Sequence, residues 1–354
     1  MIAVVGRIFD REGVGPGYVL FDDRGRVVER GKEGTLGLTP HRVVRGAVLP
    51  LMCNGHTHLG DAIWGREPPH PPLAEVVRPP HGLKHRLLAS TPRNEKVEAM
   101  RETLRGMEGG GTGGTLDFRE ESVDGIAELE EAGRDLPLHL FTLGRPRNIQ
   151  DPEEVGRVLT RADGLGLSAY KDLPPDGLER AAHEAARRGK FLALHASEDE
   201  REAIDPILAL KPSLLVHLTM ASEPDMERVR DAGVAVAFCP RSNALFGRIP
   251  PLHWAEKLEI PFLLGTDNVM FNLPDLFREM EFAYVASRLH HAAVKPETIV
   301  RSVFVNPWEL IRKPEMAEVQ PGHRALALRI PLRDLPYEVV ARAAVGDIIS
   351  PIPV

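Results

Sequence analysis

Two histidines separated by one residue, His56 and His58, begin the set of side chains in this chain that could do chemistry. Residues i and i+2 of a strand point to the same side, so both imidazoles could bind one cation, although a polar turn explains such a pair equally well. His195, His217 and Asp267 follow, each near the end of an apolar run. Imidazoles and a carboxylate suit Zn²⁺, and a catalytic site keeps a position for water. The set therefore predicts a hydrolytic metal centre.

Glu198 stands three positions after His195, where a carboxylate could cap a helix or move protons at the site. Hydrolysis at an amidine or amide carbon needs such a second group, because the leaving nitrogen must be protonated. Each residue alone has an ordinary structural explanation, such as a core histidine or an N-cap aspartate. Their shared placement at the ends of successive apolar runs favours a functional site.

The elements that would hold these residues alternate between strands and helices. Amphipathic segments separate eight apolar runs of strand length: AVLPLMCN, GGTLDF, LPLHLFTL, GLGLSAY, FLALHAS, SLLVHLT, VAVAFCP and PFLLGTD. Continuous apolar runs suit strands that are buried on both faces. Eight strand–helix repeats predict an α/β fold, a (β/α)8 TIM barrel, whose strands bring their carboxyl ends to one mouth.

Short β-type runs at both ends of the chain predict a second, smaller domain. IAVVGRIF, GYVLFDD and RVVERG lie between turn residues, and ALALRIPL near the other end is similar. We therefore expect a small β-domain from residues 1–48 and 320–354, and a metal-dependent barrel at 49–319. A Pro-rich insertion at 62–90 follows the first barrel strand and would lie over the mouth.

Composition narrows the function classes. The 354 residues are 43% hydrophobic and allow a large core, while a formal charge of −7 without a strong basic run gives no reason to expect a nucleic-acid partner. No apolar run reaches the length of a membrane span. The N-terminus lacks a signal-peptide pattern, and Cys53 and Cys239 lie far apart. We therefore expect a cytoplasmic protein without a membrane segment.

The order of the chemical residues resembles the amidohydrolase superfamily, most clearly its cytosine, guanine and adenosylhomocysteine deaminase-like branch. That pattern has His-x-His on strand one, His with Glu three later on strand five, His on strand six and Asp on strand eight. The matching residues here are His56, His58, His195, Glu198, His217 and Asp267. The segments at 239–243, 265–268, 306–307 and 319–322 also resemble this branch, but the Ala-Asp expected after the last is missing.

The resemblance covers roughly residues 44–325 and implies a barrel, a composite β-domain, a small heterocyclic substrate and often a homo-oligomer. It implies one divalent cation, zinc or alternatively Fe²⁺, with the ligands His56, His58, His195 and Asp267. Asp267 would also take a proton from the attacking water, Glu198 would pass one to a ring nitrogen, and His217 would orient the nucleophile or polarise the attacked carbon. The implied reaction hydrolyses an exocyclic amino group of a purine- or pyrimidine-type heterocycle.

Lys171 leaves a second interpretation open, because other branches of the superfamily carry a carbamylated lysine at the end of strand four that bridges two metals. With that lysine the chain would be a binuclear amide or cyclic-amide hydrolase, whereas an unmodified surface lysine leaves the deaminase. A non-enzymatic scaffold of the same fold is a third interpretation, and the intact ligand positions argue against it.

Predicted substrate contacts come from two segments. Those in the insertion, which could equally be a solvated loop, are Trp64, His81, Lys84 and His85. Arg241 and Asn243 follow strand seven and could contact the ligand or only form the turn. Asp117 and Arg119 end the second strand and could face the mouth or pair with each other.

Overall fold

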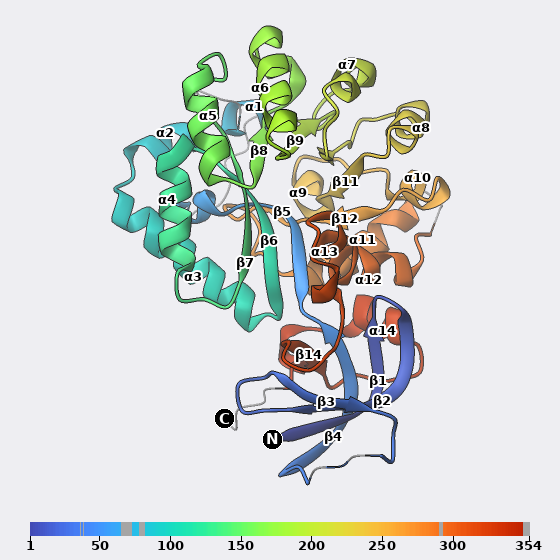
Figure 1. Ribbon diagram of the computed structural model, residues 1–354. Coiled ribbons are helices and arrows are strands. Elements are labelled where there is room, and N and C mark those ends of the chain that lie inside the picture. The colour runs from blue at the N-terminus through green and yellow to red at the C-terminus, as the bar shows by residue number, and fades with distance from the viewer. Residues whose placement is uncertain (36, 38, 65–72, 78–81, 290–292, 350–354) are drawn as a thin grey trace.

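A barrel and a smaller sheet, stacked end to end, make up the protein in the computed structural model (Figure 1). The structure describes residues 1–35, 37, 39–64, 73–77, 82–289 and 293–349. Both units are built around apolar cores, and the larger core lies between the barrel strands and their helices. The expected α/β architecture with a small additional domain is confirmed.

One parallel sheet forms the wall of the barrel. Its strands in chain order are β5 (Met52–His58), β6 (Thr112–Arg119), β7 (His139–Gly144), β8 (Gly164–Leu167), β9 (Phe191–Ala196), β10 (Leu214–His217), β11 (Ala235–Phe238), β12 (Phe262–Leu264) and β13 (Asp267–Asn268). The end strands of the sheet, β12 and β13, are consecutive pieces of the eighth apolar run. Because β12 pairs with β11 and β13 pairs with β5, the sheet curls back onto its first strand.

Helices cover the outside of the barrel and connect its strands. The longer ones are α3 (Arg93–Gly109), α4 (Ser122–Gly133), α5 (Pro152–Arg161), α6 (Pro175–Arg187), α8 (Glu223–Asp231), α11 (Leu276–Leu289) and α12 (Pro296–Phe304). Local chemistry sets their starts: the Asp151 carboxylate accepts the backbone N–H of Glu153 at α5, and Ser222 and Asp225 form a capping box at α8. Among the described residues, no helix is long and apolar enough to cross a membrane.

Shorter helices lie between these elements. After β5 the chain forms η1 (Leu59–Ile63), α1 (Leu73–Val77) and α2 (Leu83–Ser90), and η2 (Tyr170–Asp172) follows β8. Later come α7 (Ile204–Ala209), α9 (Pro240–Leu245), α10 (Leu252–Lys257), α13 (Asn306–Leu310), η3 (Pro314–Ala317) and η4 (Val345–Asp347). Figure 1 places α1 and α2 at the end of the barrel away from the small sheet. The described part of the Pro-rich insertion thus lies at the mouth.

The small sheet takes strands from both ends of the chain, in the order β14-β4-β1-β2-β3. These strands are β1 (Ile2–Asp10), β2 (Gly13–Phe21), β3 (Val27–Gly31), β4 (Arg42–Pro50) and β14 (Ala325–Leu328). Only one residue, Leu51, separates β4 from β5, so the first apolar run serves both sheets. The helix α14 (Leu335–Arg342) packs against α11 and α12 of the barrel. The boundaries 1–48, 49–319 and 320–354 therefore stay a prediction.

Candidate metal centre

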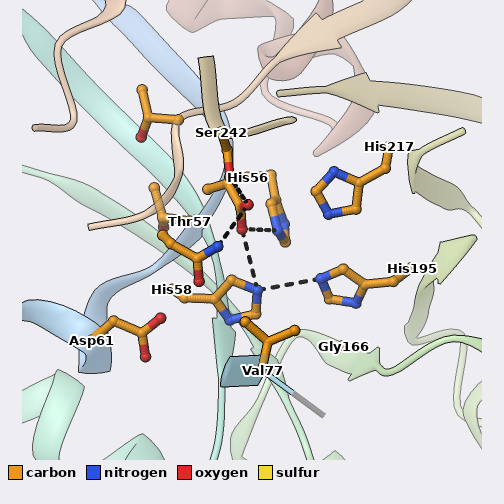
Figure 2. A network of polar contacts seen from close by, with 12 residues as sticks. His56, Thr57, His58, Asp61, Val77, Gly166, His195, His217 and Ser242 are labelled. Carbon is orange, nitrogen blue, oxygen red and sulfur yellow. Dashed lines mark hydrogen bonds and ion pairs between the residues drawn. The ribbon is translucent and has the colours of Figure 1, made fainter. Parts of the chain in front are cut away.

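The candidate metal ligands meet at the carboxyl ends of the barrel strands. His56 and His58 project from β5, His195 from β9, and Asp267 begins β13. All of these side chains are buried. Figure 2 shows the three imidazoles turned toward a common centre, with His217 of β10 beside His195. The parallel sheet thus brings together residues that lie more than two hundred positions apart.

Distances within the cluster fit a cation of the size of zinc. The Nε2 atoms of His58 and His195 are 3.2 Å apart, and Asp267 Oδ1 lies 3.3 Å from His56 Nε2 and 3.6 Å from His58 Nε2. Four ligands in a tetrahedron around Zn²⁺, with bonds of about 2.0–2.1 Å, are roughly 3.3 Å from one another. Both ring nitrogens of His56 are buried without a hydrogen-bond partner among the described residues. A buried imidazole whose nitrogens both lack a hydrogen-bond partner fits a metal ligand better than a hydrogen-bonded core histidine.

Burial keeps the imidazoles neutral, as metal ligands must be. It lowers the pKa of His58 to about 3 and also lowers the pKa values of His56 and His195. For Asp267, burial alone would raise the pKa, but the contacts with His56 and the neighbouring imidazoles hold it well below its ordinary value. At neutral pH the cluster therefore offers nitrogen lone pairs and one carboxylate.

Hydrogen bonds behind the cluster fix the orientation of two rings. His58 Nδ1 lies 2.9 Å from Glu120 Oε1, and His195 Nδ1 lies 2.8 Å from the carbonyl oxygen of Leu167. Both partners accept hydrogen bonds, so the protons belong on Nδ1 and the Nε2 lone pairs face the cluster. Carboxylate or carbonyl partners of this kind commonly accompany histidine ligands of metals.

Two donors hold the Asp267 carboxylate from the other side. Ser242 Oγ donates to Oδ2 at 2.5 Å and Asn268 Nδ2 donates to the same atom at 2.8 Å, so Oδ1 faces the imidazoles. The backbones of His217 and Asp267 have φ values of 75° and 59°, in the left-handed region that non-glycine residues rarely adopt. Such strained conformations cluster at functional sites, where they direct a side chain that regular strand geometry would place elsewhere.

Glu198, the predicted proton-transfer group, lies beside His217, which was predicted to orient the nucleophile or polarise the attacked carbon. Glu198 Oε1 lies 3.5 Å from His217 Nε2, and Asn243 Nδ2 lies 3.2 Å from His217 Nδ1. The amide of Asn243 can donate to Nδ1, which leaves the imidazole proton on Nε2, the atom that faces Glu198. Burial raises the pKa of Glu198 to about 6, so this carboxyl group exchanges its proton near neutral pH.

One pocket contains His58, His195, His217 and Asp267 in its lining, and Glu198 also faces it. Sequence reasoning missed three further lining residues, Arg145, Ser168 and Asn268. The Ser168 hydroxyl and the Asn268 carbonyl oxygen are buried without a hydrogen-bond partner among the described residues, and could therefore bind a substrate. Their places in the sequence could have indicated that they face the mouth of the barrel. Arg145 and Ser168 directly follow strands β7 and β8, and Asn268 ends β13.

The four residues of the insertion that were predicted to contact a substrate have different surroundings in the structure. Lys84 lines the pocket, but its ammonium group pairs with carboxylates behind His58. The Trp64 ring contacts Phe271 edge-on and does not line this pocket. His85 Nε2 lies 3.1 Å from a backbone carbonyl of α1. His81 lies outside the described residues, and the substrate contacts as a group stay a prediction.

The predicted contacts after strand seven have partners within the protein. The Arg241 guanidinium donates to the carbonyl oxygen of Leu273 at 3.2 Å and lies 3.6 Å from Glu279 Oε2. Asn243 contacts His217, as described above, rather than open solvent. Neither side chain lines the pocket that contains Glu198, His217 and Asp267, so their action on a substrate would be indirect.

Lys171 lines the pocket, and two carboxylates hold its amine. Its Nζ atom donates to Asp199 Oδ1 at 2.6 Å and to Glu200 Oε1 at 2.8 Å. Burial alone would lower the pKa of Lys171, but these hydrogen bonds raise it overall, so the ammonium form is favoured. Carbamylation needs the neutral amine, and these contacts therefore favour an unmodified lysine.

The amidohydrolase family model matches residues 47–328 of this chain. A protein of Methanothermobacter thermautotrophicus, provisionally named an aminohydrolase, is 37% identical over 261 residues and covers 68% of each chain. A 5-methylthioadenosine/S-adenosylhomocysteine deaminase of Pyrococcus horikoshii is 26% identical over 237 residues, which cover 58% of this chain and 56% of the deaminase. The family match spans the whole barrel and part of the small sheet.

Solved structures share the fold at low sequence identity. A guanine deaminase from C. acetobutylicum with bound guanine superposes with a TM-score of 0.76 at 11% identity and covers 98% of this chain and 97% of its own. An atrazine chlorohydrolase from Arthrobacter aurescens, complexed with zinc, has a TM-score of 0.75 at 18% identity, with 100% and 96% covered. Together with the cluster of histidines, these findings support a divalent metal ion. The chain therefore belongs to the amidohydrolase family, as a hydrolase of C–N bonds.

Proposed function

We propose that this chain is a mononuclear aminohydrolase that removes an exocyclic amino group from a purine- or pyrimidine-type heterocycle. One observation carries the proposal: Glu198, 3.5 Å from His217, lines the same pocket as the candidate metal ligands. Hydrolysis of a C–N bond needs both an activated water and a proton for the leaving nitrogen. The pocket contains groups suited to each task.

A divalent cation held by His56, His58, His195 and Asp267 would lower the pKa of a water molecule and supply a nucleophile near neutral pH. Asp267 is ionised and restrained by Ser242, so it accepts a proton from the attacking water. Glu198 donates a proton to the ring nitrogen beside the attacked carbon. His217 Nε2–H faces Glu198 and holds the attacking oxygen or the developing negative charge.

Atoms balance in this scheme without a further reactant. The water oxygen forms a bond to the ring carbon and gives one proton to Asp267. Asp267 passes this proton to the amino nitrogen, which leaves as ammonia when its bond to the ring carbon breaks, and the remaining hydroxyl group returns a proton to Glu198. The products are ammonia and the corresponding oxo heterocycle. Glu198, with a pKa near 6, can both give and regain a proton during the cycle.

Relatives support this reaction class. The matched deaminases are named for purine compounds, and the atrazine chlorohydrolase acts on another nitrogen heteroaromatic ring. The contacts of Lys171 with Asp199 and Glu200 favour one metal ion over two.

The test is ammonia release from zinc-loaded protein, measured on a panel of aminopurines, aminopyrimidines and their nucleosides. Glu198→Gln removes the transferable proton at nearly constant shape, and we expect it to slow turnover by about 10²- to 10⁴-fold while zinc is retained. Glu200→Gln is the matched control, because this exposed carboxylate stands on the same loop but does not face the pocket.

Zinc content is measured on the same samples. One ion per chain with ammonia release supports the proposal, whereas two ions per chain would support the binuclear alternative. Release of ammonia at equal rates from wild type and Glu198→Gln would contradict the assigned role of Glu198. A panel on which the zinc-loaded protein releases no ammonia would contradict the substrate class.

A further inference from the structure

A buried cluster of charged residues lies behind the metal centre, and the mechanism above does not use it. Glu120, which directly follows β6, is 2% exposed. Its Oε1 atom lies 2.9 Å from His58 Nδ1 and 2.7 Å from Lys84 Nζ. A single carboxylate oxygen thus joins a candidate metal ligand to a lysine of the insertion.

The second oxygen of this carboxylate is also held. Arg119 Nη2 donates to Glu120 Oε2 at 2.7 Å, and this guanidinium is buried beside Asp117 at 3.6 Å. The turn after β5 makes room for it, because a Cβ atom on Gly60 would lie 1.9 Å from Arg119 Nη2. With both oxygens engaged, the Glu120 carboxylate has a fixed position from which to orient the His58 ring.

Lys84 attaches the helix α2 to this carboxylate. Within the eight residues of α2, the buried side chains are Lys84 and Leu88. Lys84 Nζ also lies 3.0 Å from Oδ2 of Asp61, which belongs to η1 directly after His58. Leu88 is the one fully buried apolar side chain of α2, and the ion pairs of Lys84 add a buried polar contact that joins this helix to the residues behind His58.

We infer that Lys84 and Glu120 form a latch that couples the docking of α2 to cation binding at His58. Glu120 positions the imidazole so that its Nε2 lone pair faces the cation, and Lys84 positions Glu120. Neither residue is a ligand or a proton-transfer group in this scheme, and both act through His58. The inference rests on the proposed role of His58 as a metal ligand.

Coupling of this kind must act in both directions. If docking of α2 improves the geometry of His58 and thereby strengthens cation binding, cation binding must equally stabilise the docked helix. A merely structural ion pair would stabilise the fold without changing the affinity for metal. Metal affinity and the protection of α2 therefore separate the latch from an ordinary buried ion pair.

The chain offers a matched control for each substitution. Lys96 of α3 is also a buried lysine between two carboxylates, at 2.6 Å from Glu121 and 3.0 Å from Glu128, and it does not touch the metal centre. The test pair is therefore Lys84→Met with Lys96→Met as control. Glu120→Gln has Glu128→Gln as its control. Both pairs remove a buried charge at nearly constant size.

The first measurement is the Zn²⁺ affinity of the full chain, by competition with a chelator of known affinity. We expect Glu120→Gln to weaken binding by about 10- to 100-fold, the range found for partners of metal-bound histidines, and Lys84→Met to weaken it by less. The double variant should lose less than the product of the two single effects, because both act on one ring. Lys96→Met and Glu128→Gln should leave the affinity unchanged.

The second measurement is amide hydrogen exchange of α2 with and without Zn²⁺. Wild type should show slower exchange across α2 when zinc is bound, and Lys84→Met should lose this difference. If a variant fails to fold, the exchange of wild-type α2 with and without Zn²⁺ still tests the coupling. Glu120→Asp, which keeps the charge but has a shorter side chain, provides a second substitution.

Two failures remain distinguishable. Wild-type protein that binds no Zn²⁺ would overturn both the metal centre and the latch. Protein that binds Zn²⁺ with equal affinity in Glu120→Gln and Glu128→Gln, or whose α2 exchanges equally with and without the ion, would overturn the latch and leave the proposed metal ligands in place. Neither readout depends on which substrate the enzyme hydrolyses.

Discussion

Replacing Glu279 by glutamine should change how the stability of this protein depends on pH. Glu279 lies on α11 and is fully buried. Its Oε1 atom accepts the backbone N–H of Arg241 at 2.9 Å, while Oε2 has no hydrogen-bond partner among the described residues. Burial raises the pKa of Glu279 to about 8, although Arg241 acts in the opposite direction.

The sign of the effect follows from the raised pKa. The folded protein holds the Glu279 proton up to about pH 8, whereas the unfolded chain releases it near the ordinary value of about 4.3. The stabilisation by protonated Glu279 is complete below the pKa of this group in the unfolded chain. It is lost as the pH rises toward and through the pKa of the same group in the folded protein. Between about pH 6 and about pH 9 the wild type should lose roughly 3 kcal/mol of unfolding free energy from this group, at about 1.36 kcal/mol per pH unit below pH 8.

Glutamine does not ionise, so Glu279→Gln escapes this loss while its amide oxygen can still accept the N–H of Arg241. Denaturant unfolding of metal-free protein measures the difference between variant and wild type at both pH values, and other titrating groups cancel in that difference. Glu281→Gln, an exposed position on the same helix, is the control. A variant advantage that is the same within about 1 kcal/mol at both pH values would refute the reasoning.

Three further perturbations have defined outcomes. Removing the metal with a chelator should abolish turnover and lower the midpoint of thermal unfolding, because an ion at a hundred times its Kd stabilises the fold by about 2.7 kcal/mol. An unchanged midpoint would argue against a tightly bound ion. Ser242→Ala removes a donor from Asp267 Oδ2 and should weaken Zn²⁺ binding by about 10- to 100-fold in chelator competition. Gly60→Ala places a Cβ 1.9 Å from Arg119 Nη2 and should cost about 1–3 kcal/mol in denaturant unfolding, whereas Gly106→Ala, which meets nothing within 4 Å, should cost nothing.

The barrel and the approximate place of the metal centre could be predicted because both depend on regular strand geometry. Parallel strands bring their carboxyl ends to one mouth, so a residue at the end of an apolar run has a known neighbourhood before any coordinates exist. His56, His195 and Asp267 were placed by this rule. The rule also had limits. The first apolar run contains the end of a strand of the small sheet and the start of a barrel strand, and the eighth apolar run is interrupted between β12 and β13.

The partners of these residues could not be predicted, because they depend on contacts between segments with no fixed spacing. Glu120 directly follows Arg119, yet nothing in that position indicates that its carboxylate faces His58, 62 residues earlier. Lys84 was expected to contact a substrate because the insertion lies over the mouth, but its ammonium group turns toward Glu120. Where α2 docks is decided by side-chain packing rather than by the repeat.

The division of roles that we propose for the two carboxylates has the same origin. Asp267 and Glu198 are chemically similar, and apart from the family resemblance, their types and spacing give no reason why one should be a base and the other an acid. In the structure, Asp267 is surrounded by His56, Ser242 and Asn268, which favour its ionised form. Glu198 is half-buried with His217 as its near partner, and desolvation raises its pKa, so its protonated form persists to about pH 6. Different surroundings can thus give two similar groups opposite tasks, and those surroundings exist only after the chain has folded.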